Sequence, residues 1–536
     1  MHFGLISGSY LKNMSGGVLR REMANISDEF DSDTGQFTDV DGIISTIDAF
    51  KIVGFQSSHT YRPGWSGAWL TGRRMNEGEF PDWGNPVAEM VYESLRYFAG
   101  AEAPTAAFVP TLTGGKEQVD ARLGDDLELP VVEWDDPFDS RPYCTQSAQL
   151  IISNTNISFD GDQIPGSEFG SFTGDLDGFN AATIGNQIWA EEMGGVSRHF
   201  IGQSGANNDG APTVKNISGL GDIRGLSPQE PTREGTFYTA SAARFGAFQN
   251  LRDDLAGDQN VETFSVALAS QLPKIEFPVD GSLVTLVPFG KSVNGCLSTS
   301  PDRDDFQPMA QIVDFFIEEW ANTDIGNIDL SVNSGRPYAS FRINYEDVEQ
   351  AADHDMDGIA NYEIQVNADG SITVSLTPEY YAGCIKMNLG YVISGVESEF
   401  MHPTMVGETV TASADGLYLD IRGDAGAGDN MSYYLNTPPM LPPGACSTNP
   451  VLPMYAAACN ASPALPPAAM NATTSRTFFP AGDAGATVLQ DPLWWAAKYG
   501  NTANDLLAPG ETPSNYYLVT NAATLADQLT EAFTRI

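Results

Sequence analysis

The chain has 536 residues, of which 42% are hydrophobic, and its 8 Trp, 19 Tyr and 28 Phe supply enough apolar surface for two or three globular domains. Its formal net charge of −43 at pH 7 argues against binding to nucleic acid or an anionic membrane, because phosphates would meet a strongly repelling field. The acidity, with 53 Gly and 33 Pro, fits a loop-rich extracellular protein and equally an adaptation to a saline habitat.

The amino-terminal stretch "MHFGLISGSYLKN" lacks the basic start and the long apolar run of a signal peptide. No stretch of the chain approaches the ~18 to 20 apolar residues that span a bilayer. We therefore expect either a cytosolic protein or a chain without its natural beginning. Residues 2–7, "HFGLIS", predict a short buried strand.

The first half of the chain alternates predicted helices and strands. Residues 84–100 predict a helix that Asn85 can cap and Gly100 ends, with an apolar stripe at helical spacing. The continuous apolar run at 148–153, "AQLIIS", is typical of a buried parallel strand. Further helices are predicted at 180–195 and 236–256, and a further strand at 261–269. This alternation indicates an α/β sheet between layers of helices.

One short motif between these elements resembles a hydrolase signature. In "GQSGA", residues 202–206, Ser204 has the place of a catalytic serine, and His199 lies shortly before it. A nucleophile elbow needs G-x-S-x-G between a strand and a helix, whereas Ala206 replaces the last glycine and the loop sequence "NNDGAP" follows. The motif does not require an enzyme, and we expect no catalytic activity.

From residue 271 to about 440 the pattern changes to the alternation typical of β-strands, with Gly, Asp and Asn turns between the runs. Within this region lies "ADHDMDGIANYEI", residues 352–364, which resembles a calcium loop in which Asp353, Asp355 and Asp357 would be the first ligands and Asn361 a later one. The last position of such a loop should be a bidentate glutamate, but it holds Ile364, with Glu363 one residue early. Two interpretations stay open, a calcium site and a plain acidic turn between two strands.

Residues 441–487 form a Pro/Ala-rich connector in which we expect little regular structure. Cys446 and Cys459 flank part of it and are either a disulfide or two buried thiols. Residues 488–536 return to helix, strand and helix, the last helix capped at Asn521 and carrying an apolar stripe of Leu525, Leu529 and Phe533. This end of the chain is predicted to complete the first α/β domain after an insertion.

Ligands of open α/β sheets sit at the carboxyl ends of the strands. Two polar loops are predicted there, "WGNP" before the first helix and "SNTNISFDGD" after the strand at 148–153. They offer the oxygens of Asn85, Asn154, Asp160 and Asp162 to a cation, although each of these residues can instead be a cap or turn residue.

Nine segments, in order along nearly the whole chain, resemble the PilC/PilY family of type IV pilus biogenesis factors and tip adhesins. They are "HFGLISGSYLKNMSGGVLRR", "WGNPVAEMVYESLRYFAG", "SAQLIISNTNISFDGDQIPGS", "GLSPQEPTREGTFYTASAA", "VETFSVALASQLPKIEFPV", "FRINYEDVEQAADHDMDGIANYE", "GYVISGV", "YYLNTPP" and "DPLWWAAKYG" with "NYYLVTNAATLADQLTEAF". The family pattern at 352–357 does not depend on the following glycine, and the family's recognised calcium loop belongs to a carboxy-terminal propeller outside this chain. The resemblance then implies an acidic turn at Asp353–Glu363 that forms with or without bound calcium.

The resemblance implies an α/β von Willebrand factor A-like (Rossmann-like) sheet with a large inserted β-rich domain. The implied divisions are 1–270 for the first part of the A-like domain, 271–440 for the insertion, 441–487 for the connector and 488–536 for the last strand and helix. The strand "HFGLIS" resembles the second strand of that domain, which places the Asp-x-Ser-x-Ser metal motif before this chain. The metal site would be degenerate, with Asn85, Asn154 and Asp160 as remnants, because a neutral amide is a weaker cation ligand than a carboxylate.

The function that the resemblance implies is type IV pilus assembly and tip-associated adhesion by a non-enzymatic extracellular protein at the pilus tip or outer-membrane surface. Its expected partners are pilins, minor pilins and a host or surface ligand. The alternatives are a secreted calcium-stabilised hydrolase that uses residues 199–206, and a surface-binding module unrelated to pili.

Overall fold

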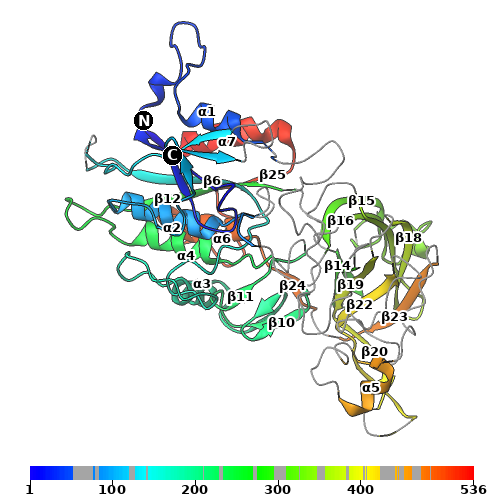
Figure 1. The fold of residues 1–536 in the computed structure, drawn as a ribbon. Helices are drawn as coiled ribbons and strands as arrows, with labels where there is room; N and C mark the ends of the chain where they lie inside the picture. Colours follow the sequence, from blue (N-terminus) through cyan, green and yellow to red (C-terminus); the bar gives the residue numbers. More distant parts are fainter. Residues whose placement is uncertain are drawn as a thin grey trace.

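Three apolar strands that are far apart in the sequence form one parallel sheet in the computed structural model of the chain (Figure 1). β12 (Val261–Leu268) is the central strand, and β6 (Ser147–Asn154) and β25 (Tyr516–Val519) pair with it on either side. All three strands are rich in apolar residues; the central β12 is buried along most of its length, whereas β6 is buried only in part and leaves Ile152 half exposed. The pairing of β25 with β12 agrees with the expectation that the last segment of the chain completes the first α/β unit.

The structure describes most of the chain, in ranges separated by gaps. The described residues are 1–51, 53, 76–78, 84–119, 127–139, 143–208, 211–228, 233–269, 275–279, 281–294, 310–324, 326–346, 356–381, 386–402, 405, 407–422, 441–442, 445, 452–460, 472–482 and 485–536.

Helices cover both faces of the parallel sheet. On one face α2 (Val87–Phe98), α3 (Ala181–Met193), α4 (Tyr238–Phe248) and α6 (Pro492–Tyr499) share a core that contains the buried Trp189 and Trp495. On the other face α7 (Leu525–Arg535) packs through Leu525, Leu529 and Ala532 against β12 and β25. Phe533, predicted on the same apolar stripe, is 41% exposed and contacts the ring of Phe3 instead.

The predicted helix boundaries are correct in two of the helices, with one exception at a cap. The Asn180 side chain accepts a hydrogen bond from the Thr183 N–H at the start of α3, and Gly194 ends that helix in the left-handed conformation. Gly100 likewise follows α2 with φ +78°. The prediction that Asn85 caps α2 is wrong, because Pro86 occupies the cap position and the Asn85 side chain turns towards β6.

Small antiparallel sheets surround this unit. β1 (Phe3–Ser7) pairs with β2 (Val18–Ala24), and β3 (Leu112–Thr113), β4 (Lys116–Val119) and β5 (Leu127–Pro130) form a second sheet beside α1 (Ile43–Ala49). The strand predicted at 2–7 is present, but its side chains are half-buried or exposed, because its described partner is β2 alone and it lies outside the parallel sheet. A fully buried ion pair between Arg20 of β2 and Glu117 of β4 joins the two sheets.

Two further small sheets lie on the side of α3. One contains β7 (Ser197–Phe200), β10 (Val214–Ile217) and β24 (Thr487–Val488), and the other contains β8 (Gln203–Ser204), β9 (Asn207–Asn208) and β11 (Ile223–Arg224). The parallel pairing of β24 with β7 brings the chain back to the α/β unit after the inserted region.

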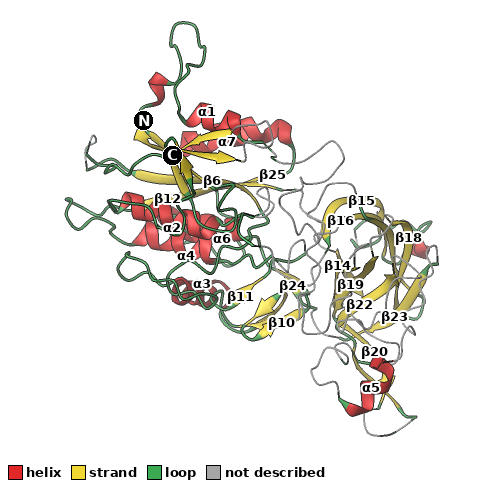
Figure 2. Ribbon diagram, in the orientation of Figure 1, coloured by secondary structure: helices red, strands yellow, loops and turns green. Residues whose placement is uncertain are grey.

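The inserted region is a sandwich of two antiparallel sheets over a shared core, and Figure 2 shows that this part of the molecule consists mainly of strands. The four-stranded sheet runs in the order β13 (Ile275–Val279), β14 (Ser282–Asn294), β19 (Lys386–Ser394), β22 (Gly416–Arg422). The seven-stranded sheet runs in the order β15 (Gln311–Ala321), β16 (Tyr338–Glu346), β17 (Gly358–Val366), β18 (Ile372–Tyr381), β23 (Thr474–Pro480), β20 (Val396–Met401), β21 (Thr409–Ser413). Buried Phe341 and Tyr362 stack inside the core.

The predicted connector at 441–487 contains more regular structure than its composition indicated. α5 (Pro453–Asn460) and β23 both lie within it, and β23 pairs with β18 and β20 in the seven-stranded sheet. β23 forms there because Phe478 can enter the sandwich core while Ser475 and Thr477 face their Ser and Thr neighbours on β18. Cys446 and the side chain of Cys459 lie outside the described residues, so the disulfide stays a prediction.

An apolar cluster and an ion pair hold the sandwich against the α/β unit. Phe200 and Ala211 contribute to a buried cluster whose other members include Val287, Val392 and Leu417 of the sandwich. Beside it, Arg198 of β7 pairs with Asp415, whose carboxylate also accepts hydrogen bonds from the backbone N–H groups of residues 395 and 396. Within the described part of the chain, no helix has both the length and the apolar character to span a membrane.

Candidate functional site

Two asparagines meet where β6 ends and α2 begins. The Asn85 side-chain amide donates hydrogen bonds to Asn154 Oδ1 at 3.0 Å and to Ser153 Oγ at 2.8 Å. Asn154 Oδ1 also accepts from the backbone N–H of Asn156 at 3.0 Å. Two polar loops were expected at the carboxyl ends of strands, and the structure brings the loops that carry Asn85 and Asn154 together at the end of β6.

The backbone fixes this contact from both sides. The Asn85 N–H donates to Ser158 Oγ at 2.9 Å, and the Ser158 N–H donates back to the Asn85 carbonyl at 3.1 Å. Ser158 is buried, so the loop after β6 is held against the start of α2. The oxygen of Asn154 already accepts two N–H groups, which makes it a poor ligand for a cation.

Asp160, the third remnant of the expected metal site, is fully buried and bonded elsewhere. Its Oδ1 accepts a hydrogen bond from the Thr236 N–H at 2.8 Å, and its Oδ2 has no hydrogen-bond partner among the described residues. Burial raises the pKa of Asp160 to about 7, although the N–H groups of Thr236 and of Ala88 in α2 counteract part of the shift. A carboxyl group that is partly protonated near neutral pH is a weak cation ligand.

A second buried carboxylate, Glu89, was not singled out from the sequence. It accepts hydrogen bonds from the Gly16 N–H at 2.7 Å and from the Gln163 N–H at 3.0 Å, so it joins the amino-terminal loop, α2 and the loop after β6. Burial raises its pKa well above the usual range, and the charges of Asp162 and Asp160 add to the shift. In the sequence, Glu89 is an acidic residue next to Met90, which belongs to the apolar stripe of the helix predicted at 84–100. This position beside the apolar stripe is the signal that could have indicated a buried carboxylate.

The acidic stretch at 352–364 does not form the expected loop in its described part. Asp353 and Asp355 lie outside the described residues. Asp357 is buried just before β17, and Gly358, predicted as the turn, is instead the first residue of that extended strand. Because a strand rises about 3.3 Å per residue, Asn361 is roughly 13 Å along the chain from Asp357, too far to share an ion with it.

Asn361 and Glu363 have partners on the surface of the sheet. The Asn361 amide donates to Glu379 on β18 at 2.6 Å, and Glu363 accepts from the Tyr338 hydroxyl of β16 at 3.1 Å. Asn361 and Glu363 thus have partners on β18 and β16, and the calcium assignment, which also needs Asp353 and Asp355 outside the described residues, stays a prediction. Among the residues that the structure describes, no group of three or more His, Cys, Asp or Glu side chains could hold a metal ion.

The region around Ser204 does not have the geometry of a nucleophile elbow. Ser204 ends the two-residue strand β8, the antiparallel strand β9 follows, and its hydroxyl lies 3.5 Å from the Asn216 carbonyl. His199 is buried, with ring nitrogens 2.8 Å from Ser197 Oγ and 3.1 Å from the Thr487 carbonyl. An elbow needs a serine presented at the start of a helix, and Ser204 is not so placed.

The amide pair gives a first testable prediction. We expect Mg²⁺ or Mn²⁺ to bind weakly or not at all at Asn85 and Asn154, because neither side chain brings a negative charge and the Asn154 oxygen is already bonded. Isothermal titration calorimetry of the chain with each ion measures this. A micromolar affinity that disappears in Asn154→Ala would contradict the prediction.

A second prediction concerns calcium at residues 353–363. We expect the melting temperature in millimolar calcium to equal that in a chelator, because Asn361 and Glu363 face other partners on the sheet. A thermal melt followed by circular dichroism measures the difference. A rise in melting temperature that is lost in Asp357→Asn would instead favour a calcium site.

Two family models match the chain, one described as the second domain of a PilY1 homolog over residues 3–246 and one as the β-sandwich of a PilY1 homolog over residues 277–463. The type IV pilus biogenesis factor PilY1 homolog of Xylella fastidiosa (strain Temecula1) is 40% identical to the chain over 572 aligned residues. The alignment covers 100% of this chain and 36% of that protein, so the chain spans little more than a third of that relative. No solved structure matches the chain.

Proposed function

The chain belongs to the PilY1 family, and from this premise we propose that it acts in type IV pilus biogenesis, as a non-enzymatic protein at the pilus tip or the outer-membrane surface. The observation that carries the proposal is the 40% identity to a pilus biogenesis factor along the whole of this chain. The alignment covers the α/β unit and the sandwich together, so both units belong to the shared architecture.

Adhesion through protein surfaces is the mechanism that we propose. The joined units offer broad sheet and helix surfaces, and the net charge of −43 favours cationic patches on partners and opposes nucleic acid. The proposed partners are pilins and minor pilins, with a host or surface ligand at the tip. The fold of the first unit, a parallel sheet between helices that the sandwich interrupts, is compatible with an A-like domain, and we propose that assignment.

The position of Ser204 gives no support to the hydrolase alternative, because the serine is not on a strand-to-helix turn. A serine-reactive probe tests this directly. We expect no labelling of Ser204, and labelling that disappears in Ser204→Ala would favour a hydrolase.

Deletion of the gene tests the pilus role. We expect the deletion strain to lose surface pili, counted by electron microscopy and by pilin in the sheared fraction, and the wild-type gene to restore them. The Ser204→Ala gene should restore pili equally well, which separates pilus assembly from catalysis. Unchanged pili in the deletion strain would exclude the proposal and leave a surface-binding module unrelated to pili.

A further inference from the structure

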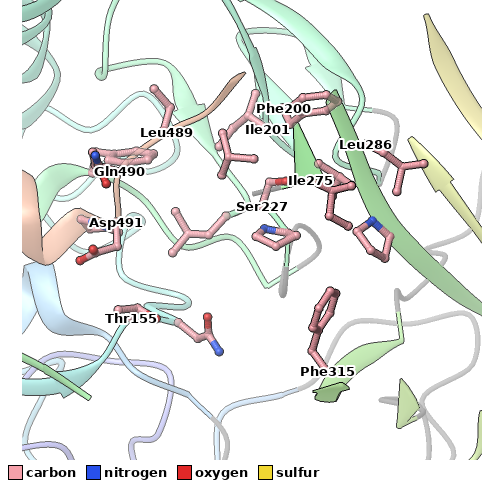
Figure 3. Close-up of a pocket in the computed structure, with 18 residues that line it drawn as sticks. Thr155, Phe200, Ile201, Ser227, Ile275, Leu286, Phe315, Leu489, Gln490 and Asp491 are labelled. Atoms are coloured by element: carbon pink, nitrogen blue, oxygen red, sulfur yellow. The ribbon is translucent and has the colours of Figure 1, made fainter. Parts of the chain in front are cut away.

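A cavity of about 380 Å³ lies between the α/β unit and the sandwich, and its walls come from both (Figure 3). Thr155, directly after β6, forms one wall, so the cavity opens at the carboxyl end of a parallel strand. Ile275 and Phe315 of the sandwich form the opposite side. The volume corresponds to the space of about thirteen water molecules in the liquid, and lies within the range of small-molecule sites.

Most of the residues that line the cavity are apolar, and the polar ones are Thr155, Asn156, Ser227, Gln490 and Asp491. Three phenylalanines line the cavity, Phe200 and Phe237 from the α/β unit and Phe315 from β15. Three prolines also line it: Pro228, Pro288 and Pro492. Proline has no backbone N–H, so an apolar ligand that covers these positions does not leave a buried donor without a partner. Rings and proline faces favour a flat, apolar molecule.

The charged side chain that lines the cavity is already hydrogen-bonded. Asp491 is the charged residue among those lining it, and its Oδ1 accepts from the N–H groups of Leu493 and Trp494 at the start of α6, while its Oδ2 accepts from the Tyr516 hydroxyl at 2.6 Å. Among the described residues, no lysine, arginine or histidine lines the space. An anionic ligand would therefore lose its hydration without gaining a counter-charge.

One polar group in the cavity is left without a partner. Ser227 lies between Leu489 of one unit and Ile275 and Leu286 of the other, as Figure 3 shows. Its Oγ is buried and has no hydrogen-bond partner among the described residues. A hydroxyl in an apolar space both donates and accepts, so a ligand with a single hydrogen-bonding group would remove the cost of leaving it unpaired.

We propose that this cavity is a binding site for a neutral, flat, mostly apolar small molecule that carries one hydrogen-bonding group, with Ser227 as its polar anchor. Such a site goes beyond the proposed pilus role and does not depend on it. Because its walls belong to both units, a bound molecule would stabilise their contact, and occupancy would be coupled to how firmly the sandwich is held.

The test uses 2-naphthol as the probe, with 2-methylnaphthalene and 2-naphthoate as matched compounds. Calorimetry on the full chain should show saturable one-site binding of 2-naphthol, about tenfold weaker binding of 2-methylnaphthalene, the equivalent of one hydrogen bond, and no measurable binding of 2-naphthoate. Equal affinity for 2-naphthoate, or no binding of 2-naphthol, would overturn the proposal.

Variants locate the site. Thr155→Trp should fill the cavity from a loop and abolish binding, whereas Thr145→Trp, the same change at an exposed position before β6, should leave it unchanged. Ser227→Ala should bring the affinities for 2-naphthol and 2-methylnaphthalene to the same value. Binding of 2-naphthol that survives Thr155→Trp in a protein with the wild-type melting temperature would show that it binds elsewhere, and would refute the assignment.

Discussion

Replacing Glu117 by leucine is expected to lower the free energy of unfolding by about 3 to 5 kcal/mol, because it leaves the guanidinium of Arg20 buried without its counter-charge. Arg20 and Glu117 are both fully buried and their side chains are 2.6 Å apart. Burial lowers the pKa of Arg20, and the charge of Glu117 counteracts this effect. Glu117 also accepts from Ser9 Oγ at 2.7 Å and the Leu11 N–H at 3.1 Å, so its carboxylate joins β4 to two other segments, residues 9–11 and β2.

Urea unfolding followed by tryptophan fluorescence measures this loss. The double variant Arg20→Met/Glu117→Leu should recover most of it, because both buried charges are then removed together. The matched control is Glu191→Leu, which breaks the Arg244–Glu191 pair on the surface, where Glu191 is 50% exposed, and should cost less than about 1 kcal/mol. If Glu117→Leu cost no more than this control, the buried pair would not be holding the amino-terminal sheets together.

Replacing Asp160 by asparagine is expected to remove a pH dependence of stability. The folded-state pKa of Asp160 is about 7, raised by burial, whereas an unfolded aspartate titrates near 3.9. Between these values the folded state holds one proton more than the unfolded state, so stability falls as the pH rises. A shift of about three pH units corresponds to about 4 kcal/mol, which wild type should lose between pH 4 and pH 8 through this group.

Urea unfolding of wild type and variant across this pH range measures the effect. The difference in unfolding free energy should move in favour of Asp160→Asn as the pH rises, because the amide cannot titrate. Asp505→Asn, the same change at an exposed position, should keep the wild-type profile. Parallel profiles for wild type and Asp160→Asn would show that Asp160 keeps its proton, or lacks it, in both states.

The sequence predicted those features that depend on neighbouring residues. The cap of α3 at Asn180, the stop of α2 at Gly100 and the strands β6 and β12 follow from local capping and apolar periodicity. The place of the loops that carry Asn85 and Asn154, at the carboxyl ends of strands, was expected from a rule about parallel sheets. Features that depend on distant partners were missed. Nothing near Glu89 indicates that Gly16 and Gln163 will donate to it.

Two segments, β23 and residues 358–366, differ from the prediction because distant strands decide their structure. The sequence did not predict β23, because the Pro- and Ala-rich residues before it dominate the composition of residues 441–487. The position of β23 is decided by Phe478, which enters the core of the sandwich. The spacing of acidic residues at 353–363 matched a calcium loop, but pairing with β16 and β18 holds residues 358–366 extended. Cross-strand pairing of this kind overrides a local motif.

The return of the chain through β24 and β25 has a consequence for the order in which the protein folds. During synthesis, which proceeds from the amino terminus, one edge of β12 stays unpaired until residues 516–519 have been made. The sandwich is complete before then, since its last strand, β23, ends at Pro480. A folded sandwich brings the segments before and after it close together, which shortens the loop that must close before β25 can join the sheet. The folded sandwich would then hold the two parts of the α/β unit near each other. A destabilised sandwich would delay completion of the parallel sheet, although the described strands of that sheet, β6, β12 and β25, all lie outside the sandwich.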